Sequence, residues 1–278
     1  MMKYLFKLVA FSFISFTLSG CKLTSIDGNP LTSGKLYQFE RTLVKGGDFW
    51  ITTYQKITDN SKPYVFYIEG DGAAWAGKYR VSHNPTPRKQ MFIKLAAMDY
   101  RPNVVYIARP CQYTPMKLNP KCTAQGGYWT DKRMSDDSVE SLNEVINKIN
   151  NNQKFSVVGF SGGGGIAVLI AARNNKIRDV LTIAANLDHA AFTYHHNVTP
   201  MIGSLNPINY AYDVRHIPQL HISGGKDDII PPFIADKFVK AVGSNCAKQR
   251  IFPAVSHNKG WERIWDYVLR NEPIRCYD

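Results

Sequence analysis

Three side chains of this sequence have the types and the chain order needed for nucleophilic cleavage of an acyl bond: Ser161, Asp227 and His257. A serine hydroxyl is a weak nucleophile at neutral pH, so it needs an adjacent base to take its proton. Histidine can take that proton and return it to the leaving group, while an aspartate holds the imidazole in the required tautomer. Asp228, directly after Asp227, is the alternative acid.

Ser161 is the centre of a Gly-x-Ser-x-Gly pattern at residues 159–163. Residues 155–158 are mostly β-branched or aromatic, which predicts a buried strand, and residues 166–172 are apolar and alanine-rich, which predicts a buried helix. A sharp turn between them would expose the serine at the amino end of the helix, where a developing negative charge is favoured. The alternative is a glycine-rich loop that merely packs a helix on a strand.

Gly162, Gly164 and Ala167 also fit the loose dinucleotide-binding pattern G-x-G-x-x-A. That function requires the glycine loop to follow the first strand, and an acidic residue at the end of the next strand. Here the loop is central, and the next expected strand ends in Ala-Ala-Asn at residues 184–186. We therefore favour the nucleophile interpretation and expect no cofactor.

Strands and helices alternate along the chain, which predicts a parallel sheet with helical crossovers. Residues 45–48 join the first two strands in an antiparallel hairpin at one edge. Reactive groups in such sheets collect beyond the carboxyl ends of the strands, where residues 69–72, Ser161, Asp227 and His257 fall. The expected strands are 37–44, 49–55, 64–68, 104–108, 155–158, 180–184, 219–223 and 250–253, and the expected helices are 87–100, 135–149, 166–172, 233–242 and 261–269.

The GFSGG turn at 159–163, the GGKDDIIPP segment at 224–232 and the late HNKGW at 257–261 resemble the α/β-hydrolase superfamily, in the order Ser, Asp, His. Within it, the chain looks like a bacterial lipoprotein esterase-like member. The resemblance implies an α/β-hydrolase fold, with a mostly parallel central sheet and helices on both faces. It implies a serine hydrolase that cleaves an ester or related acyl bond through an acyl-enzyme. The G-x-x-D-x-x-I-P spacing resembles the superfamily's acid loop and favours Asp227 over Asp228.

The tetrahedral intermediate of this reaction needs preorganised donors for its oxyanion. By position these are the N–H of Gly162 and one from the Asp71–Gly72 loop. The sequence Glu69-Gly70-Asp71-Gly72 departs from the superfamily's common His-Gly-x-Gly, since glutamate replaces histidine and Asp71 would bring a carboxylate near the oxyanion. This departure motivates an alternative: a catalytically inactive, hydrolase-like surface lipoprotein that binds a polymer or a protein partner.

The amino-terminal residues predict export. Lys3 and Lys7 give the chain a positive start, and an apolar run over residues 8–18 follows them. This run has the length of a secretory signal and is short for a membrane span. The run ends in Leu18-Ser19-Gly20-Cys21, which resembles the bacterial lipoprotein box. A plain secretory signal with an incidental cysteine is the alternative.

We therefore expect a lipoprotein signal peptide over residues 1–20 and a palmitate-bearing lipid anchor on Cys21. A tether over residues 21–34 and one hydrolase domain over residues 35–278 would follow. This places the chain on the bacterial cell envelope, with the membrane as a partner through its lipid. Lys22 favours the outer membrane, by resemblance to Gram-negative lipoproteins.

With Cys21 taken by the lipid, four of the five cysteines remain. An oxidising compartment would join them as two disulfides, in one of three pairings. We expect Cys111–Cys122 and Cys246–Cys276, because the members of each pair are close in sequence and share one loop or terminal segment. Free buried thiols are the alternative.

The formal net charge is +12, and 44% of the residues are hydrophobic, enough for a sizeable core. No nucleic-acid motif or long basic run occurs, so we expect no nucleic-acid partner, while anionic lipid or polymer stays open as a partner. Asp188, His189, His195 and His196 invite a metal interpretation, but no His-Glu-x-x-His occurs and we expect no metal. The identity of the acyl substrate and the oligomeric state stay open.

Overall fold

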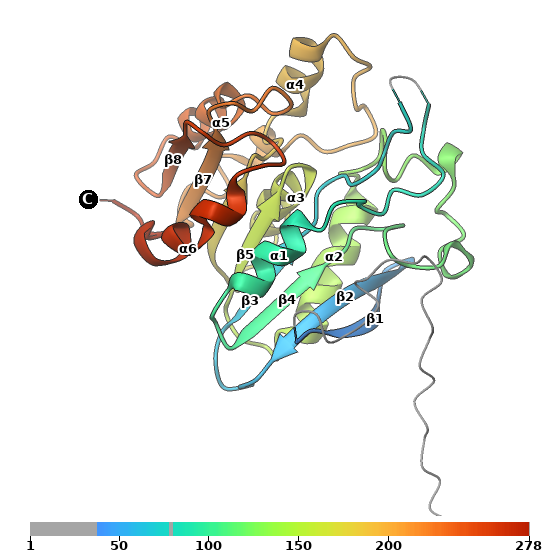
Figure 1. Ribbon diagram of the computed structural model, residues 1–278, viewed down its shortest axis with the longest axis horizontal. Coiled ribbons are helices and arrows are strands. Elements are labelled where there is room, and N and C mark those ends of the chain that lie inside the picture. The colour runs from blue at the N-terminus through green and yellow to red at the C-terminus, as the bar shows by residue number, and fades with distance from the viewer. Residues whose placement is uncertain (1–37, 78–79, 278) are drawn as a thin grey trace, which may run out of the picture. The chain divides into compact units, whose positions relative to one another are not determined.

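The structure is a computed structural model that describes residues 38–77 and 80–277. Within these residues, eight strands form one sheet in the order β1-β2-β4-β3-β5-β6-β7-β8 (Figure 1). The pairs β1–β2 and β2–β4 are antiparallel, and the other neighbouring pairs are parallel. This confirms the predicted parallel sheet with an antiparallel amino-terminal hairpin at its edge. The strands are β1 (Glu40–Gly46), β2 (Phe49–Ile57), β3 (Tyr64–Ile68), β4 (Asn103–Ile107), β5 (Phe155–Phe160), β6 (Ile177–Ile183), β7 (Gln219–Gly224) and β8 (Ala247–Phe252).

Helices cover both faces of this sheet, as Figure 1 shows. The α-helices are α1 (Met91–Met98), α2 (Asp136–Ile149), α3 (Gly162–Ala171), α4 (His189–His196), α5 (Phe233–Val242) and α6 (Trp261–Asn271). Short 3₁₀ helices occur as η2 (Met116–Leu118), η3 (Ala124–Gly126) and η4 (Pro207–Tyr210).

The central strands β3, β4 and β5 are buried throughout because both of their faces are covered. Phe66 of β3 lies in the core that α2, α3 and α5 share. Tyr67, which points to the opposite face, packs against Phe92 of α1 and Trp265 of α6, with ring centroids 5.6 and 6.2 Å away. Burial of one such aromatic side chain stabilises the fold by about 2 kcal/mol. The two layers thus hold the carboxyl ends of the strands in place.

Two expected helical segments differ from the structure. Helix α1 begins at Met91 and not at Pro87, since residues 84–87 run as irregular chain before it. Helix α4 lies within a stretch expected to be irregular. It begins after Asp188, whose side chain accepts a hydrogen bond from the N–H of Ala191, and it ends at Asn197 in the left-handed conformation. Both are ordinary helix-capping devices, so α4 carried a local signal.

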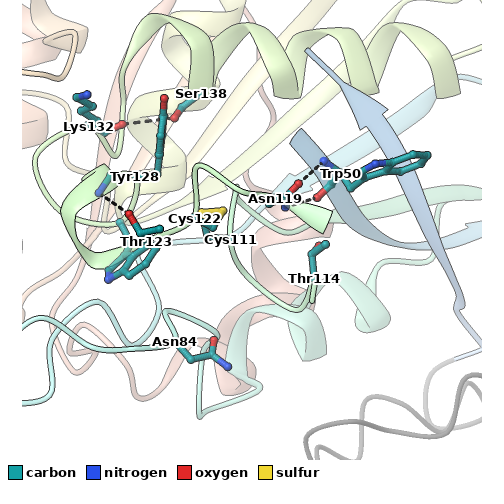
Figure 2. The surroundings of a disulfide bond; sticks show 12 residues. Trp50, Asn84, Cys111, Thr114, Asn119, Cys122, Thr123, Tyr128, Lys132 and Ser138 are labelled. Carbon is teal, nitrogen blue, oxygen red and sulfur yellow. Dashed lines mark hydrogen bonds between the residues drawn. A yellow bond between two sulfur atoms is a disulfide. The ribbon is translucent and has the colours of Figure 1, made fainter. Parts of the chain in front are cut away.

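The long segment between β4 and α2 is fastened to the sheet rather than free (Figure 2). A disulfide joins Cys111 to Cys122, and Asn119 between them bonds both backbone groups of Trp50 in β2, at 2.7 and 2.9 Å. A second disulfide joins Cys246, before β8, to Cys276 near the carboxyl end. These are the two pairs expected from the sequence.

The described residues belong to one compact unit. The expected signal peptide (1–20), lipid-bearing Cys21 and tether (21–34) lie outside the described residues. In residues 38–77 and 80–277, no helix has the length and apolar character required to cross a membrane.

Candidate active site

Ser161 lies in the tight turn between β5 and α3, as the Gly-x-Ser-x-Gly pattern predicts, but it is buried, at 8% exposure, and not exposed as expected. Its backbone has φ 52° and ψ −122°, a strained conformation for a residue with a side chain. The chain passes so close to itself here that a side chain on Gly159 would clash with the carbonyl oxygen of Gly163. The flanking glycines therefore permit the turn that holds Ser161 at the amino end of α3.

Asp227 and His257 come together although they are 30 residues apart in the chain. Asp227 follows β7 and His257 follows β8, and the Nδ1 atom of His257 lies 2.9 Å from Oδ2 of Asp227. The other carboxylate oxygen accepts hydrogen bonds from the N–H groups of Ile229 and Ile230, at 2.9 and 2.8 Å. A carboxylate held in this way accepts a hydrogen bond from the Nδ1–H group of the neutral imidazole. This tautomer leaves Nε2 without a proton and free to act as a base.

The contact distinguishes the two candidate acids. Asp227 is buried, at 5% exposure, whereas Asp228 is exposed and makes no contact of this kind in the described chain. His257 is 6% exposed, and its ring lies 5.0 Å from that of Phe160, the residue directly before Ser161. The indole N–H of the buried Trp261 bonds the His257 carbonyl at 2.9 Å. The imidazole is thus held beside the nucleophile turn.

The loop after β3 runs along the same turn. A side-chain carbon on Gly70 would lie 3.2 Å from Cβ of Ser161, so the backbone of this loop is close to the serine. Gly162 is the first residue of α3, and its N–H has no acceptor within the helix. Gly72 packs instead against Pro85 and Gln112. Of the expected oxyanion residues, Gly162 adjoins Ser161 and Asp71 lies against Gly162, whereas the residue of the loop that contacts Ser161 is Gly70, which was not expected.

The carboxylate of Asp71 is taken up by two arginines that sequence reasoning did not identify. Arg109 Nη1 pairs with Oδ1, and Arg133 Nη1 pairs with Oδ2 at 2.6 Å. Burial opposes ionisation of Asp71, but the two guanidinium groups outweigh it and lower the pKa of Asp71 to about 2. Arg109 follows β4 almost directly, which was a usable signal. Arg133 had none.

Glu69 stands where the superfamily has its histidine, and it is buried below the loop at 4% exposure. The Tyr106 hydroxyl donates to Oε2, and the Gly70 N–H donates to Oε1 at 2.7 Å. Burial raises the pKa of Glu69 to about 7, against the opposing effect of these two hydrogen bonds. Glu69 therefore fixes the first residue of the loop from beneath.

The polar residues around α4 have structural partners. Asp188 caps the helix and pairs with Lys237 at 2.6 Å, and His196 bonds the carbonyl of Ile229 at 2.8 Å. The Nε2 atom of His189 lies 3.2 Å from the carbonyl of Ser204, and the ring of His195 packs on Phe233. Among the described residues, no three His, Cys, Asp or Glu side chains are grouped so that they could hold a metal ion.

A cavity of about 460 Å³ lies between α4 and the segment that follows it. It is lined by His189, Ala190, Thr193, Tyr194, Asn197, Val198, Pro200, Met201 and Ile202. Most of these side chains are apolar, and Tyr194 is exposed at 90%. All of its lining residues come from the part of the chain between β6 and β7.

Comparison with known proteins supports the chemistry suggested by this geometry. A family model described as "Serine hydrolase (FSH1)" matches residues 101–257, a span that contains Ser161, Asp227 and His257. No curated protein matches the chain.

Solved structures share the fold at low sequence identity. An acylaminoacyl peptidase from Pyrococcus horikoshii superposes with a TM-score of 0.58 and 14% identity, over 91% of this chain and 44% of the peptidase. The esterase Pf2001 from Pyrococcus furiosus superposes with a TM-score of 0.55 and 14% identity, over 86% of this chain and 95% of the esterase. The esterase domain of a Rhodothermus marinus protein gives 0.54 and 12%, over 83% and 95%. The chain spans less than half of the length of the peptidase.

Proposed function

This chain belongs to the serine hydrolase (FSH1) family, and on that premise we propose that it cleaves an ester or related acyl bond with Ser161, His257 and Asp227. Ser161 is the nucleophile, His257 the general base and then the general acid, and Asp227 the residue that orients the imidazole. The observation that carries this proposal is the 2.9 Å contact between His257 and Asp227 beside the strained turn of Ser161.

The reaction follows in two halves. Oγ of Ser161 attacks the acyl carbon while Nε2 of His257 takes the hydroxyl proton. The tetrahedral intermediate then expels the leaving group, which receives that proton, and an acyl-enzyme remains. Water attacks the acyl-enzyme by the same route and releases the acid. The oxyanion is held by the N–H of Gly162 and by the backbone N–H of Asp71, since the Gly70 N–H donates to Glu69.

A fluorophosphonate probe tests the assignment directly, because it reacts with an activated serine. We expect the wild-type protein to label, Ser161→Ala not to label, and His257→Ala to label at least about a hundredfold more slowly. Asp227→Asn should slow labelling strongly, whereas the adjacent Asp228→Asn is the matched control and should label like the wild type. If the folded wild-type protein does not label, the proposal is wrong, and the inactive, partner-binding alternative is favoured.

The same test can address the bond that is cleaved. Initial rates on a neutral aryl ester and on an acylated peptide amide compare the two acyl classes in one assay. We expect the ester to react faster, because its aryloxide leaves more easily than an amine and less is demanded of His257 as an acid. A faster peptide cleavage would move the proposal to a peptidase.

We further propose that the chain is exported and anchored in the cell envelope by lipid on Cys21. The support is the charged start, the apolar run and the Leu-Ser-Gly-Cys box of the sequence. Metabolic labelling with an alkyne analogue of palmitate should mark the wild-type protein but not Cys21→Ser. Labelling of both, or of neither, would contradict the anchor.

A further inference from the structure

A carboxylate beside an oxyanion site is unfavourable, and the structure supplies two cations against it. A side chain on Gly162 would collide with Oδ1 of Asp71 and lie 2.7 Å from Nη1 of Arg109. We propose that Arg109 and Arg133 are positioning residues for the oxyanion, which hold the Gly70–Asp71 loop against Ser161 and reverse the sign of its charge. This inference rests on the proposed function of Ser161.

The Arg109 segment contacts the loop at two places, the Asp71 carboxylate and the Gly70 carbonyl. Nη1 of Arg109 pairs with Asp71, and the Arg109 N–H donates to Oε1 of Gln112 at 3.0 Å. Nε2 of Gln112 in turn donates to the carbonyl of Gly70 at 2.9 Å, and the same atom would lie 2.9 Å from a side chain on Gly72. The loop is thus held at Gly70 and Asp71. A fixed donor needs little reorganisation when the oxyanion forms.

Arg133 joins this assembly from the segment before α2. Its Nη1 pairs with Oδ2 of Asp71 at 2.6 Å, its Nε donates to the carbonyl of Thr130 at 2.6 Å, and its own carbonyl accepts Nη2 of Arg109. The side chain of Arg133 is 11% exposed, that of Asp71 21% and that of Arg109 3%. The Asp71–Arg133 edge therefore faces the solvent side, and Arg109 lies behind it.

The three residues Asp71, Arg109 and Arg133, here called the Arg–Asp cluster, carry one more positive than negative charge. Glu69 is the other acid of this loop. Burial keeps part of its population neutral near pH 7, so it cancels only part of the excess. Nε of Arg109 is buried and bonds no described atom, so this side chain keeps one unpaired donor in the interior. A positive charge in a water-poor site acts strongly on a developing anion.

The two ion pairs explain how a carboxylate can stand in the Glu-Gly-Asp-Gly loop beside the serine. Asp71 does not oppose the oxyanion as an isolated charge, because its two oxygens are each engaged by a guanidinium group. In place of the superfamily's histidine–glycine loop, this chain uses an ion-paired loop whose net charge favours the tetrahedral intermediate over the neutral ester. Removal of this charge should therefore lower kcat and leave the KM of a neutral substrate nearly unchanged.

Arg133 is the residue to vary, because its removal leaves the Arg109–Asp71 pair in place to hold the loop. We expect Arg133→Gln to lower kcat on a neutral aryl ester about tenfold, with KM changed less than about twofold. Arg133→Lys keeps the charge and should retain most of kcat. The double variant Asp71→Asn with Arg133→Gln restores the excess positive charge and keeps Oδ1 for Arg109, so kcat should recover toward the wild-type value.

A boronic acid inhibitor provides the second readout, since it forms an anionic tetrahedral adduct on the serine. Its Ki should rise about tenfold in Arg133→Gln and return in the double variant, whereas a structural defect would not be rescued by a second substitution. Arg173→Gln, which loses an ion pair with the exposed Asp136, is the matched control and should behave like the wild type. Thermal unfolding checks that all variants are folded.

The outcomes separate this inference from the proposed function. If the wild type labels at Ser161 and hydrolyses the ester while Arg133→Gln keeps its kcat within about twofold, the cluster has no role in catalysis and only this inference is overturned. If Arg133→Gln loses kcat and the double variant does not recover, the role is structural and the charge argument is wrong. A wild type without labelling or turnover overturns both.

Discussion

Glu69 and Asp71 are two residues apart on one loop, and their surroundings shift their pKa values in opposite directions. Burial dominates at Glu69 and raises its pKa to about 7, whereas two guanidinium groups outweigh burial at Asp71 and lower its pKa to about 2. Ionised Asp71 therefore adds stability above pH 3.8, its ordinary pKa, which is lost as the pH falls toward 2. Glu69 has the reverse effect, because its folded state prefers the proton.

We expect Glu69→Gln to remove a fall in stability between pH 4.5 and pH 7. The folded wild type keeps the Glu69 proton up to a pH of about 7, while the unfolded chain releases it near 4.5, so wild-type stability declines as the pH rises through this interval. The decline is at most about 3 kcal/mol. Glutamine can still accept from the Gly70 N–H and bond the Tyr106 hydroxyl.

Urea unfolding at about pH 5 and about pH 8 measures this difference. The free energy of unfolding should drop between the two pH values in the wild type and less in Glu69→Gln. The exposed Glu40→Gln is the matched control and should follow the wild type. An equal drop in wild type and Glu69→Gln would show that Glu69 titrates like an exposed carboxyl.

The segment between β4 and α2 contains both a disulfide and residues that contact the loop after β3. It carries Arg109 and Gln112, which brace the Gly70–Asp71 loop. Cys111 lies between these two residues in the sequence, and its disulfide partner Cys122 follows later in the same segment. Cys111 itself has φ 74°, a left-handed conformation that its surroundings must impose. The cross-link therefore holds Gln112 in register with the loop as well as limiting the unfolded chain.

We expect removal of the two disulfides to have different consequences. The double variant Cys111→Ser, Cys122→Ser should lose about 2–3 kcal/mol of stability and also lower kcat severalfold, because the segment that carries Gln112 gains freedom. The double variant Cys246→Ser, Cys276→Ser should lose a similar amount of stability but keep kcat, because that link joins the start of β8 to the carboxyl-terminal segment. Initial rates at saturating ester, corrected for the folded fraction, decide the point. Equal kcat in both variants would contradict it.

How far the sequence predicts these elements depends on whether the signal is local. The strand, glycine turn and helix around Ser161 were predictable, because apolar runs and flanking glycines act within a few residues. The start of α1 was misplaced, since Pro87 suits a first turn but the helix begins at Met91, after irregular chain at residues 84–87. The pairing of Asp71 with Arg133 spans 62 residues and has no periodic pattern, so only the folded chain reveals it.

The order of strands accounts for the site as a whole. Strands β3 and β5 are neighbours, and β6 leads from β5 to β7 and β8, so the loop of Glu69, Ser161, Asp227 and His257 all lie beyond the carboxyl ends of one parallel set. None of these residues is near its partners in sequence. The parallel register places them at one edge of the sheet, which explains why the superfamily resemblance, resting on three short motifs, predicts the fold and the contact between Asp227 and His257.

The charge of the molecule adds a property that no single site supplies. The formal net charge of the full sequence is +12, and positive charge favours contact with anionic surfaces. The lipid anchor proposed for Cys21 would act together with this charge, since the two combined hold a protein on a membrane better than either alone. We expect the compact unit from Gly34 onward to bind phosphatidylglycerol vesicles at about 50 mM salt and to dissociate at about 500 mM, because salt screens exposed charges. Co-sedimentation measures this, with neutral phosphatidylcholine vesicles as the control. Binding that survives high salt would point to apolar insertion, for which the exposed Tyr194 and Ile202 beside the α4 cavity are the residues to substitute.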